Sequence, residues 1–240
     1  MQHSSTATIA LATLLASCEV GPYRQPLPPP PPPDPRLVQA NMEEHADVAN
    51  ELHRAILDGR LHAARDRAQR FVWYDRAWAT EGPQSDELIA AADTIYRARD
   101  LVTAAGGMAR LAYACGACHE RRGVRIDDSS IPPEELPGLS GQMVRHGWAA
   151  QRLWDALVIP SDRAWREGVS AIGNTAIDLA RTTNAKPNER VVELAEHLDD
   201  IAMHAGSIDD HARRATVYGE MMVTCARCHS IVRPGHTTSR

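Results

Sequence analysis

The 240-residue chain lacks several patterns by which large classes of protein are recognised. Beyond the N-terminal segment, no stretch approaches the ~18 uninterrupted apolar residues of a membrane span. The net charge is −5 and there is no basic cluster, so we expect no nucleic-acid partner. Strand-like alternation is also missing, whereas alanine is abundant. The sequence therefore predicts an all-α protein.

Cysteine is scarce, and four of the five cysteines fall in two copies of one pentapeptide. The first copy is Cys115-Gly-Ala-Cys118-His119, and the second is Cys225-Ala-Arg-Cys228-His229. Two C-x-x-C-H sequences in one short chain are typical of covalently attached c-type haem. Two thiols three positions apart on a helical turn can each add to a haem vinyl group, and the adjacent imidazole then meets the iron. We therefore expect two haems c, with His119 and His229 as proximal ligands.

Two other uses of C-x-x-C were weighed against haem attachment. A thioredoxin-type redox pair should lie near a βαβ pattern, which the sequence does not contain. A structural zinc site would need a second pair of ligands for each metal ion at finger-like spacing. The histidine that follows at once in both copies favours haem.

The fifth cysteine, Cys18, closes Leu15-Ala16-Ser17-Cys18 after a mostly apolar run that begins at Ile9. This end resembles the lipobox of bacterial lipoproteins, in which the cysteine is lipidated, so residues 1–18 are interpreted as a signal peptide with a lipobox. An ordinary signal peptide cut near Ala16 and a buried N-terminal helix are the alternatives. The first eight residues contain no Lys or Arg, which departs from the usual basic start of a signal peptide.

Residues 19–36 are rich in proline, with six consecutive prolines from Pro28 to Pro33. Such a tract adopts extended polyproline II at ~3.1 Å per residue, so residues 22–35 would reach about 40 Å. We interpret this segment as a stalk between a membrane anchor and the folded part. A docking motif for an aromatic-lined domain is the alternative.

The rest of the chain repeats itself. A shift of 101 residues places Val38, Met42, His45, Ala49, Leu52, Ala55 and Ile56 on Leu139, Met143, His146, Ala150, Leu153, Ala156 and Leu157. These positions step mostly by three or four, so they form one helical stripe in each copy. The C-x-x-C-H motifs repeat with a shift of 110. The sequence thus predicts a tandem duplication, with domains at 37–126 and 138–233 and a tail at 234–240.

Each copy is expected to contain four helices. The first copy has them at 37–57, 60–78, 86–103 and 108–121, with Gly106-Gly107 as the last stop and Ser85 as an N-cap. The second copy has them at 141–158, 162–181, 189–205 and 208–232, with caps at Ser140, Ser161, Asn188 and Ser207. Trp148, Trp154 and Trp165 are expected in the core or against haem, whereas histidines without a shared register, such as His53 and His211, are expected at the surface.

A four-helix repeat with C-x-x-C-H near the end of its last helix, and a Met on its first helix, resembles cytochrome c′ and its low-spin four-helix-bundle relatives. The resemblance covers residues 37–121 and 139–232. It implies two tandem four-helix bundles, each with one covalent haem near the end of its last helix. It also implies that the first helix supplies the residue on the distal side of the iron, which is Met42 in one copy and Met143 in the other.

The sequence departs from this family pattern at one turn further along the same stripe, where His45 and His146 lie. A Met thioether and an imidazole both bind haem iron, and the choice strongly alters the reduction potential. Either pair is a candidate for the sixth ligand, and the distance to the turn at Gly59 favours the methionines. The methionines alternatively only fill core space.

The expected function is electron transfer, because a low-spin iron with both axial positions filled is suited to exchanging electrons. The chain is then an electron carrier and not an enzyme, with redox proteins as partners. A lipid anchor would hold it at the periplasmic side of a bacterial membrane, the outer membrane being favoured. Gas binding at an open distal site is the alternative, whereas a dihaem peroxidase would need acid/base residues beside an open haem, which the sequence does not suggest.

Overall fold

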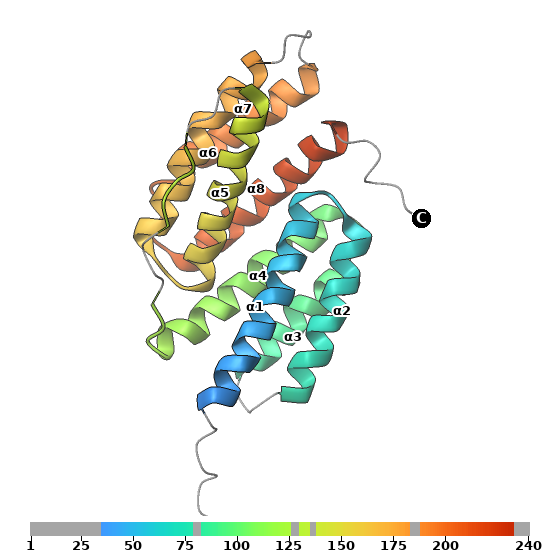
Figure 1. Cartoon of the computed structure of the whole chain (residues 1–240). Coiled ribbons are helices and arrows are strands. Elements are labelled where there is room, and N and C mark those ends of the chain that lie inside the picture. Colours follow the sequence, from blue (N-terminus) through green and yellow to red (C-terminus); the bar gives the residue numbers. More distant parts are fainter. Residues whose placement is uncertain (1–34, 79–82, 126–129, 135–137, 183–187, 233–240) are drawn as a thin grey trace, which may run out of the picture.

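The structure of the protein is a computed structural model, which describes residues 35–78, 83–125, 130–134, 138–182 and 188–232. Within these residues the chain forms helices and no strand, so the prediction of an all-α protein is confirmed. The helices are α1 (Pro35–Leu57), α2 (Leu61–Trp78), α3 (Pro83–Tyr96), α4 (Leu101–Arg121), α5 (Gly138–Val158), α6 (Asp162–Thr182), α7 (Glu189–Ala205) and α8 (His211–Val232) (Figure 1).

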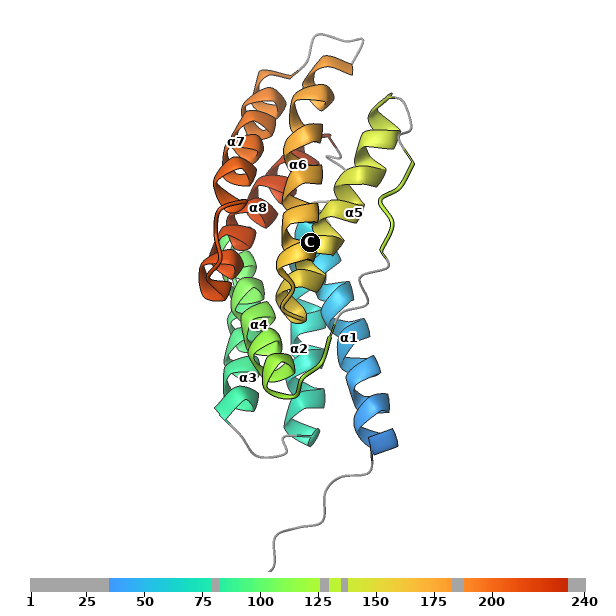
Figure 2. The same cartoon turned by 90° about the vertical axis from the view of Figure 1, so that its left-hand side faces the viewer.

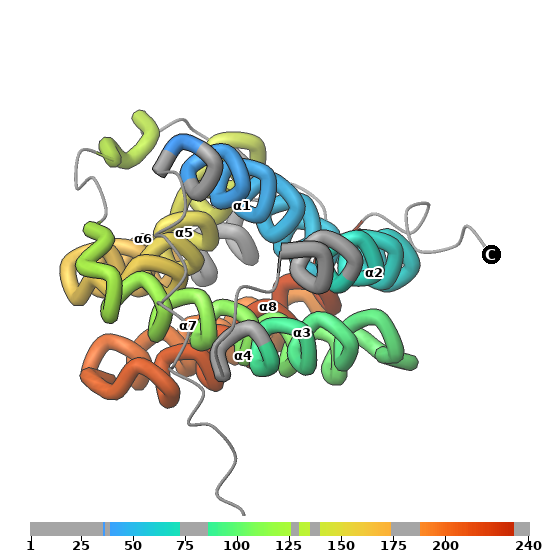
Figure 3. The backbone as a smooth tube through the Cα atoms, turned by 90° about the horizontal axis from the view of Figure 1, so that it is seen from below, coloured from blue at the N-terminus to red at the C-terminus, as the bar shows by residue number. Residues whose placement is uncertain are grey.

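The helices fall into two groups that pack in chain order, α1 to α4 and α5 to α8. We call these the first and second helix groups (Figures 1 and 2). The two groups meet mainly where α4 packs against α8, but α4 also contacts α5, and α8 contacts α1. Figure 3 places α1 and α5 on one side of the molecule and α3, α4 and α7 on the other. The last helix of each group therefore reaches the first helix of the other group.

The boundary between α3 and α4 corrects the sequence prediction. The chain leaves α3 at Tyr96, and Asp100 caps α4 by accepting a hydrogen bond from the Thr103 backbone at 2.7 Å. The helix then continues through Gly106-Gly107, where the sequence predicted a stop. A Cβ at Gly107 would lie 2.6 Å from Ile95 Cγ1, so this glycine permits close packing of α3 and α4. A polar cap thus marks the helix start, and Gly107 serves packing, whereas a Cβ at Gly106 would meet no neighbouring atom within 4 Å.

The predicted caps agree with the structure at two of five positions. Asn188 caps α7 with its side chain, and Ser161 Oγ accepts from the Ala164 backbone at the start of α6. Ser140 lies inside α5, and Ser85 lies inside α3 because that helix already begins at Pro83. Ser207 donates to the His204 carbonyl instead, while Asp210 accepts from the Arg213 backbone and starts α8. The acidic side chain at Asp210 outcompetes the hydroxyl because a charged acceptor caps more strongly.

The core is built largely from alanines with a few large side chains, so the helices approach closely. Trp165 and Trp154 are buried, as the sequence predicted. Among the described helices, α4 is long and apolar enough to span a membrane, and half of its apolar window is buried. Because a core helix has the same composition, this is weak support for a membrane span.

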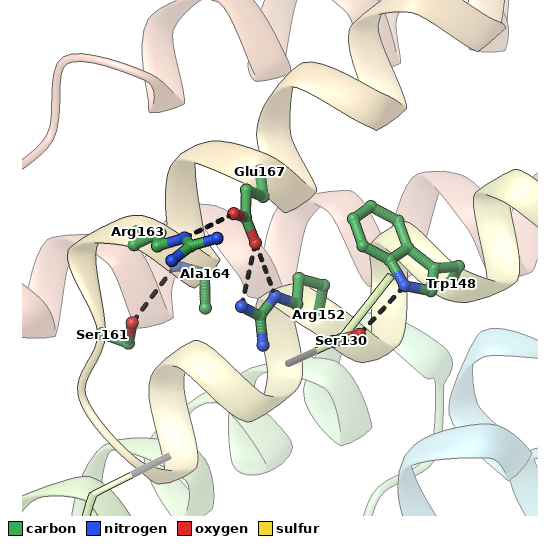
Figure 4. Close-up of polar contacts among 7 residues, drawn as sticks. All are labelled: Ser130, Trp148, Arg152, Ser161, Arg163, Ala164 and Glu167. Atoms are coloured by element: carbon green, nitrogen blue, oxygen red, sulfur yellow. Dashed lines mark hydrogen bonds and ion pairs between the residues drawn. The ribbon is translucent and has the colours of Figure 1, made fainter. Parts of the chain in front are cut away.

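A buried arginine links α5 to α6 (Figure 4). The Arg152 side chain is 1% exposed, and both its Nε and Nη2 contact the Glu167 carboxylate at 2.9 Å. The other Glu167 oxygen accepts from the exposed Arg163 at 2.8 Å. Burial raises the pKa of the Glu167 carboxyl, but the two arginines outweigh it and leave the pKa below its usual value. The carboxylate therefore stays charged beside a desolvated guanidinium.

We expect Glu167→Gln to lower the free energy of unfolding by about 2 kcal/mol, because it takes the carboxylate away from a buried guanidinium. Arg163→Gln removes the exposed partner of the same carboxylate and should cost less than about 0.5 kcal/mol. Urea unfolding followed by far-ultraviolet circular dichroism measures both. Equal losses in the two variants would mean that burial of Arg152 adds nothing to the ion pair.

Candidate functional site

Both C-x-x-C-H motifs lie in the last two turns of the helices that connect the groups. Cys115, Cys118 and His119 are on α4, and Cys225, Cys228 and His229 are on α8. All four motif cysteines are half-buried. The helix continues through each motif, which keeps the two thiols of a pair on neighbouring turns.

Each motif histidine is hydrogen-bonded to the other helix group. His119 Nδ1 lies 2.7 Å from the Val158 carbonyl at the end of α5, and His229 Nδ1 lies 2.8 Å from the Leu57 carbonyl at the end of α1. A carbonyl oxygen only accepts hydrogen bonds, so both Nδ1 atoms must carry the proton. In the neutral ring Nε2 then holds a lone pair, and the carbonyl fixes the ring orientation. This is the state of an imidazole that binds iron.

The two carbonyls are available because α1 and α5 end in the same way. Arg60 donates its backbone N–H to Ala55, and Ser161 donates to Ala156, which is the same five-residue bond shifted by 101 residues. Gly59 supplies the turn in the first group with a φ of +72°, which favours glycine. Neither pattern uses the carbonyl of the last helical residue, Leu57 or Val158. These orphan acceptors receive the motif histidines.

The docking of each motif requires a small residue at the crossing. A Cβ on Gly116, inside the first motif, would clash with the Leu157 carbonyl and with His211 Nε2. The second motif has Ala226 at this position, and it faces Gly59, where a Cβ would lie 3.1 Å from the Ala226 carbonyl. Each crossing therefore contains one glycine, on the motif in one case and on the opposite turn in the other.

The candidates for the distal ligand differ in their exposure. Met42 is 45% exposed, and Met143 is half-buried. By contrast, the Nε2 atoms of His45 and His146 are buried, and His146 Nε2 has no hydrogen-bond partner. Burial, then the neighbouring charges of His229 and Arg145, lower the pKa of His146 to about 4. His146 is thus a neutral imidazole close to the second motif histidine, with a buried Nε2 atom that lacks a hydrogen-bond partner.

These atoms fit a c-type haem better than the other uses of C-x-x-C. A thioredoxin-type cysteine needs a lowered pKa, whereas burial, together with Cys228, raises the pKa of the Cys225 thiol to about 12. The pKa of Cys228 is also raised by burial. Among the described residues, no three His, Cys, Asp or Glu side chains form a group suited to a metal ion, so a zinc site of protein ligands is not formed there.

A polar cluster that the sequence did not suggest lies between the two groups. His53 was expected at the surface but is 1% exposed and stacks on Trp154, with ring centroids 4.9 Å apart. Tyr218 donates its hydroxyl to the Ala150 carbonyl at 2.8 Å, and His53 Nε2 therefore donates to the Tyr218 oxygen. Trp154 donates to Asn50 at 2.9 Å. We call these four side chains, His53, Trp154, Tyr218 and Asn50, the junction cluster.

A signal for the junction cluster was present in the repeat. His53 and Trp154 are 101 residues apart, so they occupy equivalent positions of the two copies and stack on one another where the copies meet. Because their chemistry differs, the repeat comparison does not align them as a conserved pair. His211, also expected at the surface, is half-buried beside Tyr113 and Gly116.

An apolar groove of about 450 Å³ follows the crossing of α4 and α8. Its walls include Val102, Tyr113 and Val223, and they include no motif cysteine or histidine. The groove is thus separate from the residues predicted to hold haem. Cys18, the stretch 1–18 and the stalk up to Asp34 lie outside the described residues, as does the tail 234–240.

The junction cluster makes stability depend on pH. Burial, and then the Arg54 charge, lower the pKa of His53 to about 3, whereas the unfolded chain protonates this histidine near pH 6.5. The unfolded state therefore binds one more proton between these values, and stability falls as the pH falls, by up to about 1.4 kcal/mol per unit. We expect His53→Gln to remove this one-proton contribution. Guanidinium unfolding at pH 7 and pH 4.5 measures the free energy of unfolding of both proteins. The loss of packing in His53→Gln is the same at both pH values, so a difference between them reports the proton-linked contribution. An unchanged slope would contradict the buried neutral state.

Comparison of the chain with protein-family models, with curated proteins and with solved structures found no match. The functional conclusion consequently depends on the residues themselves. The proposal is supported by the two pentapeptides, by the motif histidines that carbonyls orient, and by the histidines on α1 and α5 with buried Nε2 atoms.

Proposed function

We propose that the protein is a dihaem c-type cytochrome that transfers electrons in the bacterial cell envelope. Each helix group would hold one haem, attached through Cys115 and Cys118 in the first group and through Cys225 and Cys228 in the second. The observation that best supports this proposal is that both motif histidines donate Nδ1–H to a backbone carbonyl, which leaves Nε2 available to bind iron. When bound, haem iron supplies one-electron chemistry, and the protein residues set its potential.

Histidine is the sixth ligand that the geometry favours. His146 has a buried lone pair near His229, and His45 is the equivalent residue of the first group. Met42, which the sequence favoured, is 45% exposed. We therefore propose His45 and His146 as the distal ligands. Bis-imidazole ligation lowers the reduction potential relative to His/Met ligation.

Two filled axial positions favour electron transfer over gas binding. An iron with two imidazoles offers no open position to nitric oxide, carbon monoxide or a peroxide. The protein would then act as an electron carrier between partner proteins and not as an enzyme. A lipid at Cys18, followed by a proline-rich stalk, would hold the two haem bundles at the periplasmic side of a membrane, because an acyl chain supplies membrane affinity.

The test of haem content is direct. The mature protein should carry two haems that survive extraction with acidified acetone, because thioether bonds hold them. The double variant Cys115→Ala/Cys118→Ala should lose one haem by intact mass, and Cys225→Ala/Cys228→Ala should lose the other. One haem or none in the unmutated protein would overturn the dihaem assignment.

The test of the distal ligands uses carbon monoxide. Removal of a sixth ligand opens a coordination position, so His45→Ala and His146→Ala should each convert one haem to a high-spin form that binds carbon monoxide. The matched variants Met42→Ala and Met143→Ala should leave both haems low-spin. Visible spectra of the reduced proteins with and without the gas measure both outcomes. Carbon monoxide binding to both haems of the unmutated protein would replace electron transfer by gas binding.

A further inference from the structure

The two motif histidines have different electrostatic surroundings, although their hydrogen bonds are equivalent. Beside His229, the Asp58 carboxylate lies with Oδ1 3.9 Å from Nδ1. Asp58 directly follows Leu57, whose carbonyl accepts the His229 hydrogen bond. In the second group the residue that directly follows Val158 is Ile159, at the position equivalent to Asp58. The residue after the accepting carbonyl is thus apolar in the second group, whereas in the first group it is an aspartate whose carboxylate lies near His229.

The carboxylate is held in place by an arginine. Arg60 Nη2 contacts the other carboxylate oxygen of Asp58 at 3.0 Å. The equivalent residue of the second group is Ser161, which carries no charge. Asp58 is 37% exposed in its side chain, which makes it replaceable without opening the core. The charge therefore comes from a surface residue at the end of α1.

We propose that Asp58, a residue of the first helix group, is a positioning residue for His229 that lowers the reduction potential of the second haem below that of the first. This inference rests on the proposed function, because it concerns the potentials of the two haems. Each proximal ligand is oriented by the opposite group, so the end of α1 tunes the haem on α8. The end of α5, with Ile159, leaves the haem on α4 at the higher potential.

The physical reason is the preference of each oxidation state for charge. A carboxylate near the imidazole N–H increases the basicity of the ligand, and its negative charge stabilises ferric over ferrous iron. Arg60 opposes this effect from the far side of the carboxylate. An electron on the second haem consequently moves downhill to the first. The internal direction of transfer is thereby set by one acidic side chain.

Potentiometric titration of the complete dihaem protein tests the inference. The unmutated protein should show two midpoints, and Asp58→Asn should raise the lower one and leave the upper one unchanged. The equilibrium constant for electron exchange between the haems should change by at least about threefold. Arg60→Gln should lower the same midpoint further. The reciprocal variant Ile159→Asp should lower the upper midpoint, and Ile159→Asn controls for altered packing.

The outcomes separate this inference from the proposed function. If intact mass shows two haems but Asp58→Asn shifts both midpoints equally, shifts the upper one, or shifts neither, the role of Asp58 is overturned while the dihaem assignment stands. If the protein carries fewer than two haems, the proposed function itself fails. Circular dichroism spectra that match the unmutated protein exclude unfolding as the cause of a shift.

Discussion

The hydrogen bonds from His119 and His229 to the opposite helix group determine how the two copies are joined. Each bond satisfies a helix-end carbonyl that has no intrahelical partner, and each fixes an imidazole in the tautomer that binds a metal. Because donor and acceptor come from different groups, neither site is complete within its own copy. The close crossings at Gly116 and Gly59 follow from the same contact, since the motif helices must approach the ends of α5 and α1.

The junction cluster lies one helical turn from both of these histidine–carbonyl hydrogen bonds. His53 lies four residues before Leu57, and Trp154 lies four residues before Val158, so the stacked rings stand one turn from each accepting carbonyl. The Tyr218 hydroxyl satisfies His53 Nε2 and the Ala150 carbonyl together. A buried histidine with this partner stays neutral, and its ring packs as an aromatic surface. The cluster therefore holds α1, α5 and α8 in the arrangement that the motif histidines require.

The two repeats give the motif histidines equivalent hydrogen bonds but different neighbouring residues. Equivalent helix ends supply equivalent carbonyls, but the next residue is Asp58 in the first group and Ile159 in the second, and the Asp58 carboxylate lies 3.9 Å from His229 Nδ1. Because Asp58 is 37% exposed and paired with Arg60, solvent and the arginine screen part of its charge. The two motif histidines can thus differ in the charge beside them while their hydrogen bonds stay equivalent.

Local sequence determined the helices, the C-x-x-C-H motifs, the repeat of 101 residues and the candidate distal residues, because each depends on spacing within one helix or one turn. Local sequence did not predict that α4 begins after Asp100 and continues through Gly106-Gly107. A glycine can end a helix or permit two helices to pack closely, and its neighbours in space decide which. Local sequence also could not show that Met42 is 45% exposed while His45 Nε2 is buried, because the two residues lie on one stripe and their burial depends on how the helix is rotated against the core. The pairing of His119 with Val158, of His229 with Leu57 and of His53 with Trp154 was decided by the tertiary structure alone. These contacts join residues that are distant in the sequence, and no local pattern specifies which helix end meets which ring.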